Sequence, residues 1–190
     1  GAMGTMIQSY NMTEKDYRGD SFVDHPCDLK GNNDLLTLTQ PNIIKEIHKK
    51  YLKAGADIIT TNTFNATSIS QADYQMESIV YELNKQSALI AKQAIIDMGY
   101  KKSSNPRFVC GSLGPTNKTA SMSPDVSNPA YRNIDFEELV NAYKEQVKGL
   151  IDGGVDLILI ETVFDTLNCK AALFAGHDYF EREGILIPVM

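Results

Sequence analysis

Ala54-Gly-Ala-Asp-Ile-Ile-Thr-Thr-Asn-Thr-Phe64 and Gly153-Gly-Val-Asp-Leu-Ile-Leu-Ile-Glu-Thr-Val163 are two copies of one sequence pattern. Each copy has a glycine that ends a helix, an aspartate two residues later, an aliphatic run of strand length, and then a polar residue followed by threonine. Asn62 and Glu161 occupy the equivalent polar position. The internal repeat therefore predicts strand-helix units that recur along the chain.

Two further apolar runs have strand length, at 107–113 and at 185–190. Near-continuous apolar character with β-branched residues is typical of strands that are buried on both faces of a parallel sheet. Helical patterns with recognisable ends lie between the runs. We expect helices from Pro41 to a stop at Gly55, from about Ser70 to Met98 before Gly99, from a cap at Asp135 to Gly153-Gly154, and from a cap at Thr166 to Gly184.

Alternating strands and helices indicate an α/β fold with right-handed crossovers. A doubly wound sheet and an eight-stranded βα barrel are both built from such units, and both bind ligands at the carboxyl ends of their strands. No glycine-rich dinucleotide motif follows any predicted strand, which favours the barrel. The expected fold is thus a partial (β/α)8 TIM barrel, with parallel strands that alternate with helices, in a single domain over residues 1–190.

The composition narrows the classes of partner. A net charge of −6 without long runs of Lys and Arg argues against a nucleic-acid surface, and no apolar run reaches membrane-spanning length. The N-terminus lacks a secretory signal pattern. Three widely spaced cysteines fit reduced thiols better than disulfides, so we expect a cytoplasmic protein that binds small molecules or other proteins.

Glu161 ends an otherwise aliphatic strand. Burying a carboxylate there is costly unless it pairs with a cation or a ligand amine, so we predict that it binds a ligand. The alternative is a strand-end glutamate that reaches water. Thr61 and Asn62 offer hydroxyl and amide groups at the matching end of the earlier strand, and they are candidates for binding a polar substrate, although threonine is also an ordinary strand residue.

The loop Gly111-Ser-Leu-Gly-Pro-Thr-Asn-Lys-Thr119 follows a strand and superficially resembles a phosphate-binding loop. Asn117 stands where that motif requires a glycine before the lysine. We therefore interpret Gly114, Pro115 and Thr116 as a turn that lines the mouth of the site. Upstream, Gly31-Asn-Asn-Asp34 has the composition of a turn, and Asp34 either belongs to that turn or caps or orients a neighbouring loop.

The cysteines and histidines show no spacing that is typical of a metal site. His25-Pro-Cys27 is their only close pair along the sequence, and free cysteine is usually a small buried apolar residue. We expect no metal ligand among these residues.

Six motifs together resemble one family. They are GAMGTMIQ from Gly1, CDLKGNNDLL from Cys27, AGADIITTNTFNAT from Ala54, ADYQMES from Ala72, GSLGPTNKTASMSPDV from Gly111 and DLILIETVFDTLNCKAAL from Asp156. In this order they are similar to the homocysteine-binding domain of cobalamin-dependent methionine synthases over essentially the whole chain. The residues from Gly1 to Thr5, which otherwise look like the remnant of a cleaved expression tag, then resemble native sequence that forms the loop after the first strand of the barrel.

The resemblance implies a barrel that binds homocysteine at its C-terminal mouth. The backbone of Gly1 and Ala2 would lie near the carboxylate of the amino acid, Thr61 would contact its polar end, and Glu161 would receive its ammonium group. The family binds zinc through three cysteines later in the domain, one alone and two adjacent. The zinc-activated thiolate takes a methyl group from methylcobalamin to give methionine, and cobalamin and 5-methyltetrahydrofolate, the ultimate methyl source, sit on other modules.

The chain departs from the family pattern at three places. The strand and aspartate that precede GAMGT are missing, Thr60 stands where the family commonly has glutamate, and the chain stops at Met190, before the zinc-binding cysteines. A complete barrel has about 250 residues and eight strands. We therefore expect an incomplete domain that binds no cofactor alone and lacks turnover, and whose unpaired sheet edges are covered by the rest of its barrel.

Two other functions stay open at this point. A homocysteine methyltransferase that uses betaine or S-methylmethionine shares the barrel and the zinc chemistry, although the GNNDLL and PTNKTASMSPDV motifs favour the cobalamin type. A non-catalytic amino-acid-binding module is the second alternative. Zinc-dependent binding of homocysteine with proton release would support an enzyme, whereas zinc-independent binding of many amino acids would support the module.

Overall fold

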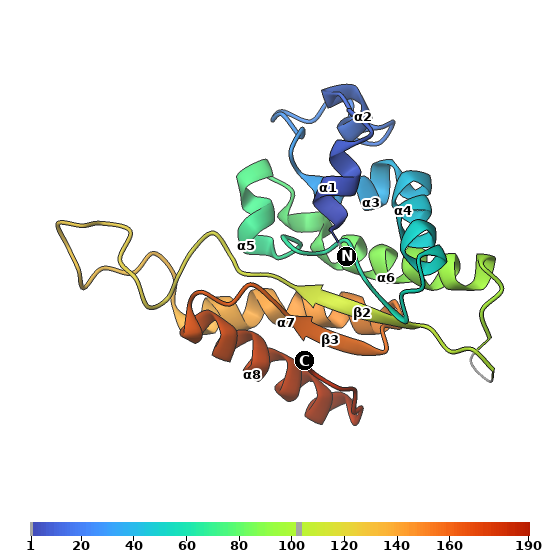
Figure 1. The fold of residues 1–190 in the computed structure, drawn as a ribbon. Coiled ribbons are helices and arrows are strands. Elements are labelled where there is room, and N and C mark those ends of the chain that lie inside the picture. Colours follow the sequence, from blue (N-terminus) through green and yellow to red (C-terminus); the bar gives the residue numbers. More distant parts are fainter. Residues whose placement is uncertain (1, 102–103) are drawn as a thin grey trace.

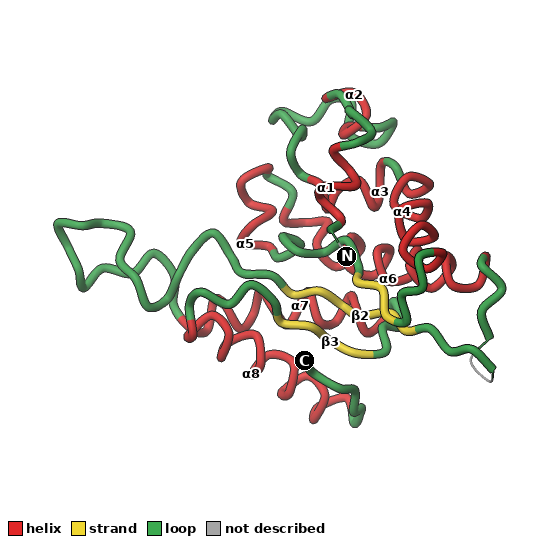
Figure 2. Tube along the Cα trace, in the orientation of Figure 1, coloured by secondary structure: helices red, strands yellow, loops and turns green. Residues whose placement is uncertain are grey.

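The computed structural model describes residues 2–101 and 104–190. Its sheet has three parallel strands, β1 (Ile58–Thr60), β2 (Phe108–Leu113) and β3 (Leu157–Ile160), in the spatial order β1-β2-β3 (Figure 1). Figure 2 shows that these strands are short and that helices and loops make up most of the chain. Since the spatial order is also the order along the sequence, each crossover joins neighbouring strands. The predicted α/β fold with parallel strands and alternating helices is confirmed.

The fourth predicted strand is shorter than expected. In the described part of the chain, residues 185–190 form one isolated parallel bridge, between Ile158 and Val189. Met190 N donates to Ile158 O and Ile160 N donates to Met190 O, both at 2.9 Å, so the end of the chain runs along β3. Pro188 has no N–H to offer, and Leu186 is 91% exposed, so neither extends the ladder.

Four long helices cover one face of the sheet. They are α4 (Pro41–Lys53), α6 (Val80–Asp97), α7 (Phe136–Asp152) and α8 (Thr166–Glu183). Consecutive helices are neighbours, and α7 lies behind the sheet in Figure 1. From the sheet, Ile59, Val109, Leu113 and Ile158 are buried in the core that these helices share.

Most helix ends follow from local chemistry. Glu138 N donates to Asp135 Oδ1 at 2.8 Å and Asp135 N donates to Glu138 Oε2 at 2.9 Å, which is a capping box at the start of α7. Gly184 ends α8 with a φ of +63°, a conformation that favours glycine. The predicted cap of α8 is wrong by one residue. Asp165, not Thr166, is the cap, because its carboxylate accepts hydrogen bonds from Leu167 N and Asn168 N.

The single helix predicted from Ser70 to Met98 is interrupted. The short helix α5 (Ser68–Gln71) and the 3-10 turns η2 (Ala72–Tyr74) and η3 (Glu77–Ile79) precede α6. Gln75 breaks the periodic stretch with a φ of +54°, and Met76 is buried in the N-terminal core. Tertiary burial of Met76 thus prevails over helical periodicity here.

The N-terminal part packs against α4. It comprises α1 (Met3–Gln8), α2 (Glu14–Arg18), η1 (Asn33–Leu35) and α3 (Leu36–Thr39), and it has its own core cluster. The expected loop over residues 1–5 is wrong from Met3 onward, because α1 begins there and buries Ile7 against this cluster. Gly1 lies outside the described residues.

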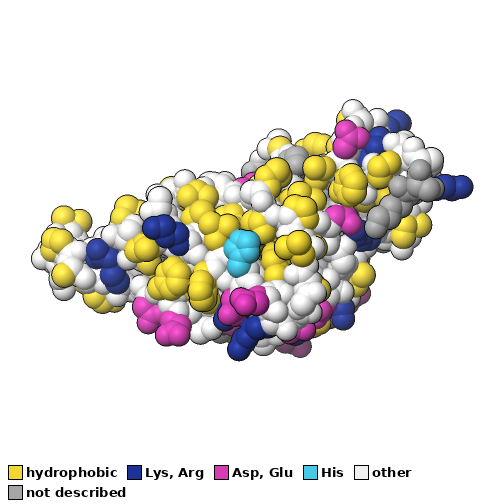
Figure 3. Space-filling model, turned by 90° about the horizontal axis from the view of Figure 1, so that it is seen from below, with side chains coloured by type: hydrophobic (Ala, Val, Ile, Leu, Met, Phe, Trp, Pro, Cys, Tyr) yellow, Lys and Arg dark blue, Asp and Glu magenta, His cyan; other side chains and the backbone are white. Residues whose placement is uncertain are grey.

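The other face of the sheet is partly open. Ile58 and Phe108 are partners in register and are 43% and 37% exposed. Seen from the side of α8, the surface also carries many apolar side chains (Figure 3), and Leu167, Phe174, Leu186 and Met190 are among the exposed apolar residues. None of the described helices has the length and apolar character that crossing a bilayer requires.

We predict that Gly149→Ala destabilises the fold. A Cβ at Gly149 would come within 2.6 Å of Tyr81 O, so α6 and α7 would have to separate. Such overpacking lowers the free energy of unfolding by about 1–3 kcal/mol. The matched control is Gly176→Ala in α8, where the nearest atoms would be 4.0 Å away. Urea denaturation should show a loss for the first variant and no loss for the second; equal midpoints would contradict this packing.

Candidate functional site

Polar side chains meet at the carboxyl ends of all three strands. Ser112 Oγ, near the end of β2, donates a hydrogen bond to Oε1 of Glu161, which directly follows β3. Ser112 N donates to Thr61 Oγ1 at 3.0 Å, and Thr63 Oγ1 donates to Ser112 O at 2.8 Å. The two threonine hydroxyls are 2.6 Å apart. Ser112 therefore links the end of β1 to the end of β3.

The strand register explains why Glu161 and Ser112 meet. Ser112 pairs with Leu159, and Glu161 lies two residues further along, on the same face. Cys110 shares this face because it lies two residues before Ser112. Burial, together with the neighbouring Glu161 carboxylate, raises the pKa of the Cys110 thiol to about 12. This thiol therefore stays protonated and is not a thiolate nucleophile at neutral pH.

Thr61 and Asn62 directly follow β1 and are 3% and 5% exposed. Asn62 N donates to Ser87 Oγ and Asn62 Nδ2 donates to Asn33 O, both at 2.8 Å. Their polar groups are thus used to hold the end of β1 in place. The role of each in substrate binding stays a prediction.

Glu161, Gly114 and Pro115 line one crevice. Its remaining walls come from Tyr143, Ile160, Thr162, Val163, Phe164, Asp165, Asn168 and Cys169. Tyr143 Oη donates to Gly114 O at 3.0 Å. A Cβ at Gly114 would overlap the carbonyl oxygen of Phe64, so glycine allows the loops after β1 and β2 to touch. Thr116, which was predicted beside them, is buried, and its hydroxyl donates to Lys118 O at 2.6 Å, so its role at the site stays a prediction.

The backbone beside Glu161 is strained. Thr162 has a φ of +57°, which a β-branched residue rarely adopts. Strained residues of this kind persist where the surrounding structure holds them, and they cluster at functional sites. The residue after Glu161 therefore supports a functional interpretation of this crevice.

The N-terminus reaches the same region through Asn33. Ala2 is exposed, and its carbonyl accepts the hydrogen bond from Met6 N at 3.1 Å that begins α1. A Cβ at Gly4 would lie 4.0 Å from Asn33 Nδ2, so α1 lies beside the residue that holds Asn62. Of the two residues predicted near the substrate carboxylate, Gly1 is not described, and the role of Ala2 stays a prediction.

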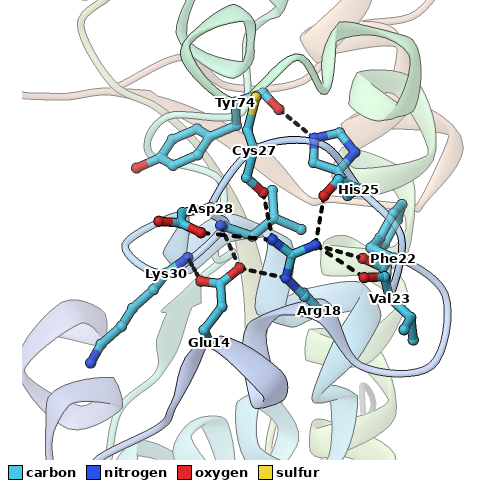
Figure 4. A network of polar contacts seen from close by, with 10 residues as sticks. Glu14, Arg18, Phe22, Val23, His25, Cys27, Asp28, Lys30 and Tyr74 are labelled. Carbon is cyan, nitrogen blue, oxygen red and sulfur yellow. Dashed lines mark hydrogen bonds and ion pairs between the residues drawn. The ribbon is translucent and has the colours of Figure 1, made fainter.

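Arg18 and Glu14 hold the segment that brings Asn33 to the site (Figure 4). Arg18 donates hydrogen bonds to the carbonyl oxygens of Val23 at 3.1 Å, His25 at 2.7 Å and Cys27 at 2.9 Å. Leu29 N and Lys30 N donate to the Glu14 carboxylate, at 2.9 and 2.7 Å. Burial raises the pKa of Glu14, but these backbone hydrogen bonds and the Arg18 guanidinium outweigh it and hold that pKa below its ordinary value.

The sequence left open whether Asp34 is only part of the turn over residues 31–34 or also orients a neighbouring loop. In the structure it orients the loop that follows β1. It is 3% exposed, and Asn65 N donates to its Oδ1 at 3.3 Å. Burial raises the pKa of Asp34 to about 7, although backbone hydrogen bonds from Asn65 and Phe64 oppose that rise. This aspartate therefore titrates near neutral pH in the folded chain.

Within residues 2–101 and 104–190, no three His, Cys, Asp or Glu side chains are grouped so that they could hold a metal ion. His25 Nε2 lies 2.7 Å from Tyr74 O. His48 is 1% exposed, and burial lowers its pKa to about 4, so it is neutral. The described residues thus do not form a zinc site.

Comparison with known proteins identifies the family. The family model for homocysteine S-methyltransferase matches residues 1–190. The chain belongs to the homocysteine S-methyltransferase family. Solved structures of the homocysteine methyltransferase MmuM from Escherichia coli are similar in fold: the metallated form has a TM-score of 0.69 at 20% identity and the apo form 0.61 at 19%. These matches cover 99% and 94% of this chain but 59% and 54% of the MmuM chains, so the chain spans little more than half the length of these relatives.

In this homocysteine S-methyltransferase domain, the sequence interpretation missed Ser112. The alternation of side chains along Phe108–Leu113 could have indicated it. Val109 and Leu113 face the core, so Cys110 and Ser112 share the opposite face of the strand. Asn33 and Ser87 also hold Asn62 in place. Asn33 does so through its backbone carbonyl oxygen, and Ser87 does so through its hydroxyl from the distant helix α6. No local pattern marks such partners.

We predict that Arg18→Ala lowers the free energy of unfolding by about 2–4 kcal/mol, because three carbonyl oxygens, two of them in part-buried hydrogen bonds, lose a charged donor. Arg18→Lys should lose most of the same stability, since an ammonium group cannot reproduce the planar array of donors. Lys15→Ala, at an exposed position of the same helix, is the control and should change stability by less than about 0.5 kcal/mol. Thermal unfolding of the three variants measures this, and an unaffected Arg18→Ala protein would refute it.

We predict that Asp34→Asn flattens the pH dependence of stability. The folded-state pKa of about 7 lies above the unfolded value of about 3.9, so the folded state binds more protons between these values. Stability of the unaltered chain should therefore fall as pH rises from about 4 to about 7, and the variant should lack this fall. Denaturation midpoints across this range test the prediction, with the exposed Asp28→Asn as control. Parallel profiles for the unaltered chain and Asp34→Asn would disprove it.

Proposed function

We propose that this chain supplies the homocysteine-binding part of a methyltransferase of the cobalamin-dependent methionine synthase type. Membership of the homocysteine S-methyltransferase family supports the substrate and the reaction class. The GNNDLL and PTNKTASMSPDV motifs support the cobalamin type. The product is then methionine, and the methyl group comes ultimately from 5-methyltetrahydrofolate.

The observation that carries the proposal is the position of Glu161. Its carboxylate lies at the carboxyl end of the sheet, on the face opposite the buried side chains of Val109 and Leu113, and it lines the crevice with Gly114 and Pro115. Among the described residues, Ser112 is its hydrogen-bond partner, at one of the two carboxylate oxygens. The second oxygen suits the ammonium group of homocysteine, because a carboxylate and an ammonium form a charge-assisted pair.

We propose that the domain over residues 1–190 is one arc of a (β/α)8 barrel. The strands are parallel and follow each other in sequence order. The end of the chain forms a parallel bridge beside β3, where a fourth strand of a barrel would lie. The long helices lie on one face. Ligands of such barrels bind at the carboxyl ends of the strands, where Glu161 is found.

The cofactors follow from the family rather than from the described residues. These residues do not fit a zinc site, so we propose that the zinc ligands follow Met190 and that the chain alone is inactive. Zinc, when bound, would supply the thiolate form of homocysteine. Cobalamin and folate would be held by other modules of the same cytoplasmic protein, and the residues of this chain would bind and orient the amino acid.

We predict that Glu161→Gln weakens homocysteine binding by about 30-fold or more in the intact protein, because the ammonium group loses its charged partner. 4-Mercaptobutanoate, which lacks the ammonium group, should bind the unaltered protein weakly, and the variant should no longer distinguish the two compounds. Calorimetric titration measures both affinities. Glu181→Gln, at an exposed position of α8, is the control. A Glu161→Gln protein that still prefers homocysteine would exclude this role.

A further inference from the structure

The loop between β2 and α7 is long and irregular. It runs from 114 to 135, beginning at the crevice and reaching outward in Figure 1. Val126 is 96% exposed, and Met122 and Tyr131 are about half exposed. Loops of this length without regular structure are uncommon unless they have a function.

The first turn of α8 holds the base of this loop through two side chains. Ser121 N and Ser121 Oγ donate to Asp165 Oδ2 at 3.0 and 2.5 Å. Asn168 Nδ2 donates to Thr116 Oγ1 at 3.0 Å and to Lys118 O at 2.8 Å, and Ala120 N donates to Asn168 Oδ1 at 3.1 Å. Asp165 and Asn168 are 3% and 4% exposed.

The same two residues border the crevice. Asp165 follows Glu161 by four residues, and both it and Asn168 line the crevice together with Gly114 and Pro115. The other Asp165 oxygen, Oδ1, accepts hydrogen bonds from Leu167 N and Asn168 N. One carboxylate thus fixes the start of α8 and the base of the loop at once.

The tip of the loop is closed on itself. In the described chain, the hydrogen bonds of Ser123 join Asp125 and Asn128, and Asp125 accepts from Ser127. Arg132 donates to carbonyl oxygens of the loop, including Ala120 O at 3.0 Å. The position of the tip relative to the crevice therefore depends on the contacts at its base.

We infer that Asp165 and Asn168 are positioning residues that keep the 114–135 loop closed against α8 and thereby fix the width of the crevice beside Glu161. This inference rests on the proposed function, because the ligand that the crevice would take is the amino-acid substrate. Neither residue needs to touch that ligand. Their effect is to hold the wall formed by Gly114 and Pro115 at a set distance from Glu161.

The test compares Asp165→Asn and Asn168→Ala with the unaltered intact protein. Trypsin cleavage after Lys118 and Arg132, detected by mass spectrometry of the new termini, reports opening of the loop. We expect cleavage there to accelerate and homocysteine affinity to fall, each on the order of tenfold, which is the effect of one lost charge-assisted hydrogen bond. Asp125→Ala removes a contact inside the tip only and should leave both values unchanged.

Circular dichroism at the assay temperature identifies variants that unfold. If Asp165→Asn unfolds, Asn168→Ala alone decides the matter. Unchanged cleavage in both variants would show that Asp165 and Asn168 do not hold the loop closed. Faster cleavage with unchanged homocysteine affinity would show that they do not position the crevice. If the unaltered protein does not bind homocysteine, the proposed function fails. The cleavage rates still show whether Asp165 and Asn168 hold the loop closed.

Discussion

The structure around the candidate site depends on the hydrogen bonding of Ser112. Its N–H, carbonyl and hydroxyl groups are bonded to Thr61, to Thr63 and to Glu161. Gln146 of α7 adds donors to Thr63 O and to Ser112 O, at 2.8 and 3.3 Å. Polar groups at the end of a buried sheet must be satisfied in this way, because each one left unpaired costs about 1–3 kcal/mol. The network therefore ties the ends of three strands together and fixes Glu161.

Two segments far apart in the sequence then converge on this network. Asn33 and Asp34 come from the N-terminal part and hold Asn62 and Asn65, and the Arg18 contacts shape the segment that carries them. The loop after β2 comes from the other side and is fastened by Asp165 and Asn168. In both cases, buried side chains that make several hydrogen bonds fix irregular backbone segments. These segments lack the regular backbone hydrogen bonds of a helix or a sheet.

Local signals were sufficient for much of the fold. Pro41 and Gly55 bracket α4, and Asp135 and Gly153 bracket α7, because caps and helix breakers act within one or two turns. Local signals failed at Gln75, where the burial of Met76 interrupts a periodic stretch, and at Met3, where packing of Ile7 makes a helix of an expected loop. For the site, the aliphatic run before Glu161 was enough to single out that residue. Ser112 was overlooked because its significance depends on register.

Local sequence patterns were enough to predict the class of fold, the repeated strand-helix units, the family and the prominence of Glu161. Each of these follows from residue periodicity, from helix caps or from motifs that lie within short windows. Three other features became visible only in the folded chain: Ser112 is the partner of Glu161, burial raises the pKa of Asp34 to about 7, and Asp165 joins a helix to a loop 44 residues away. Hydrogen bonds across such separations depend on how strands and helices are placed in space, and residue spacing along the chain does not encode that placement.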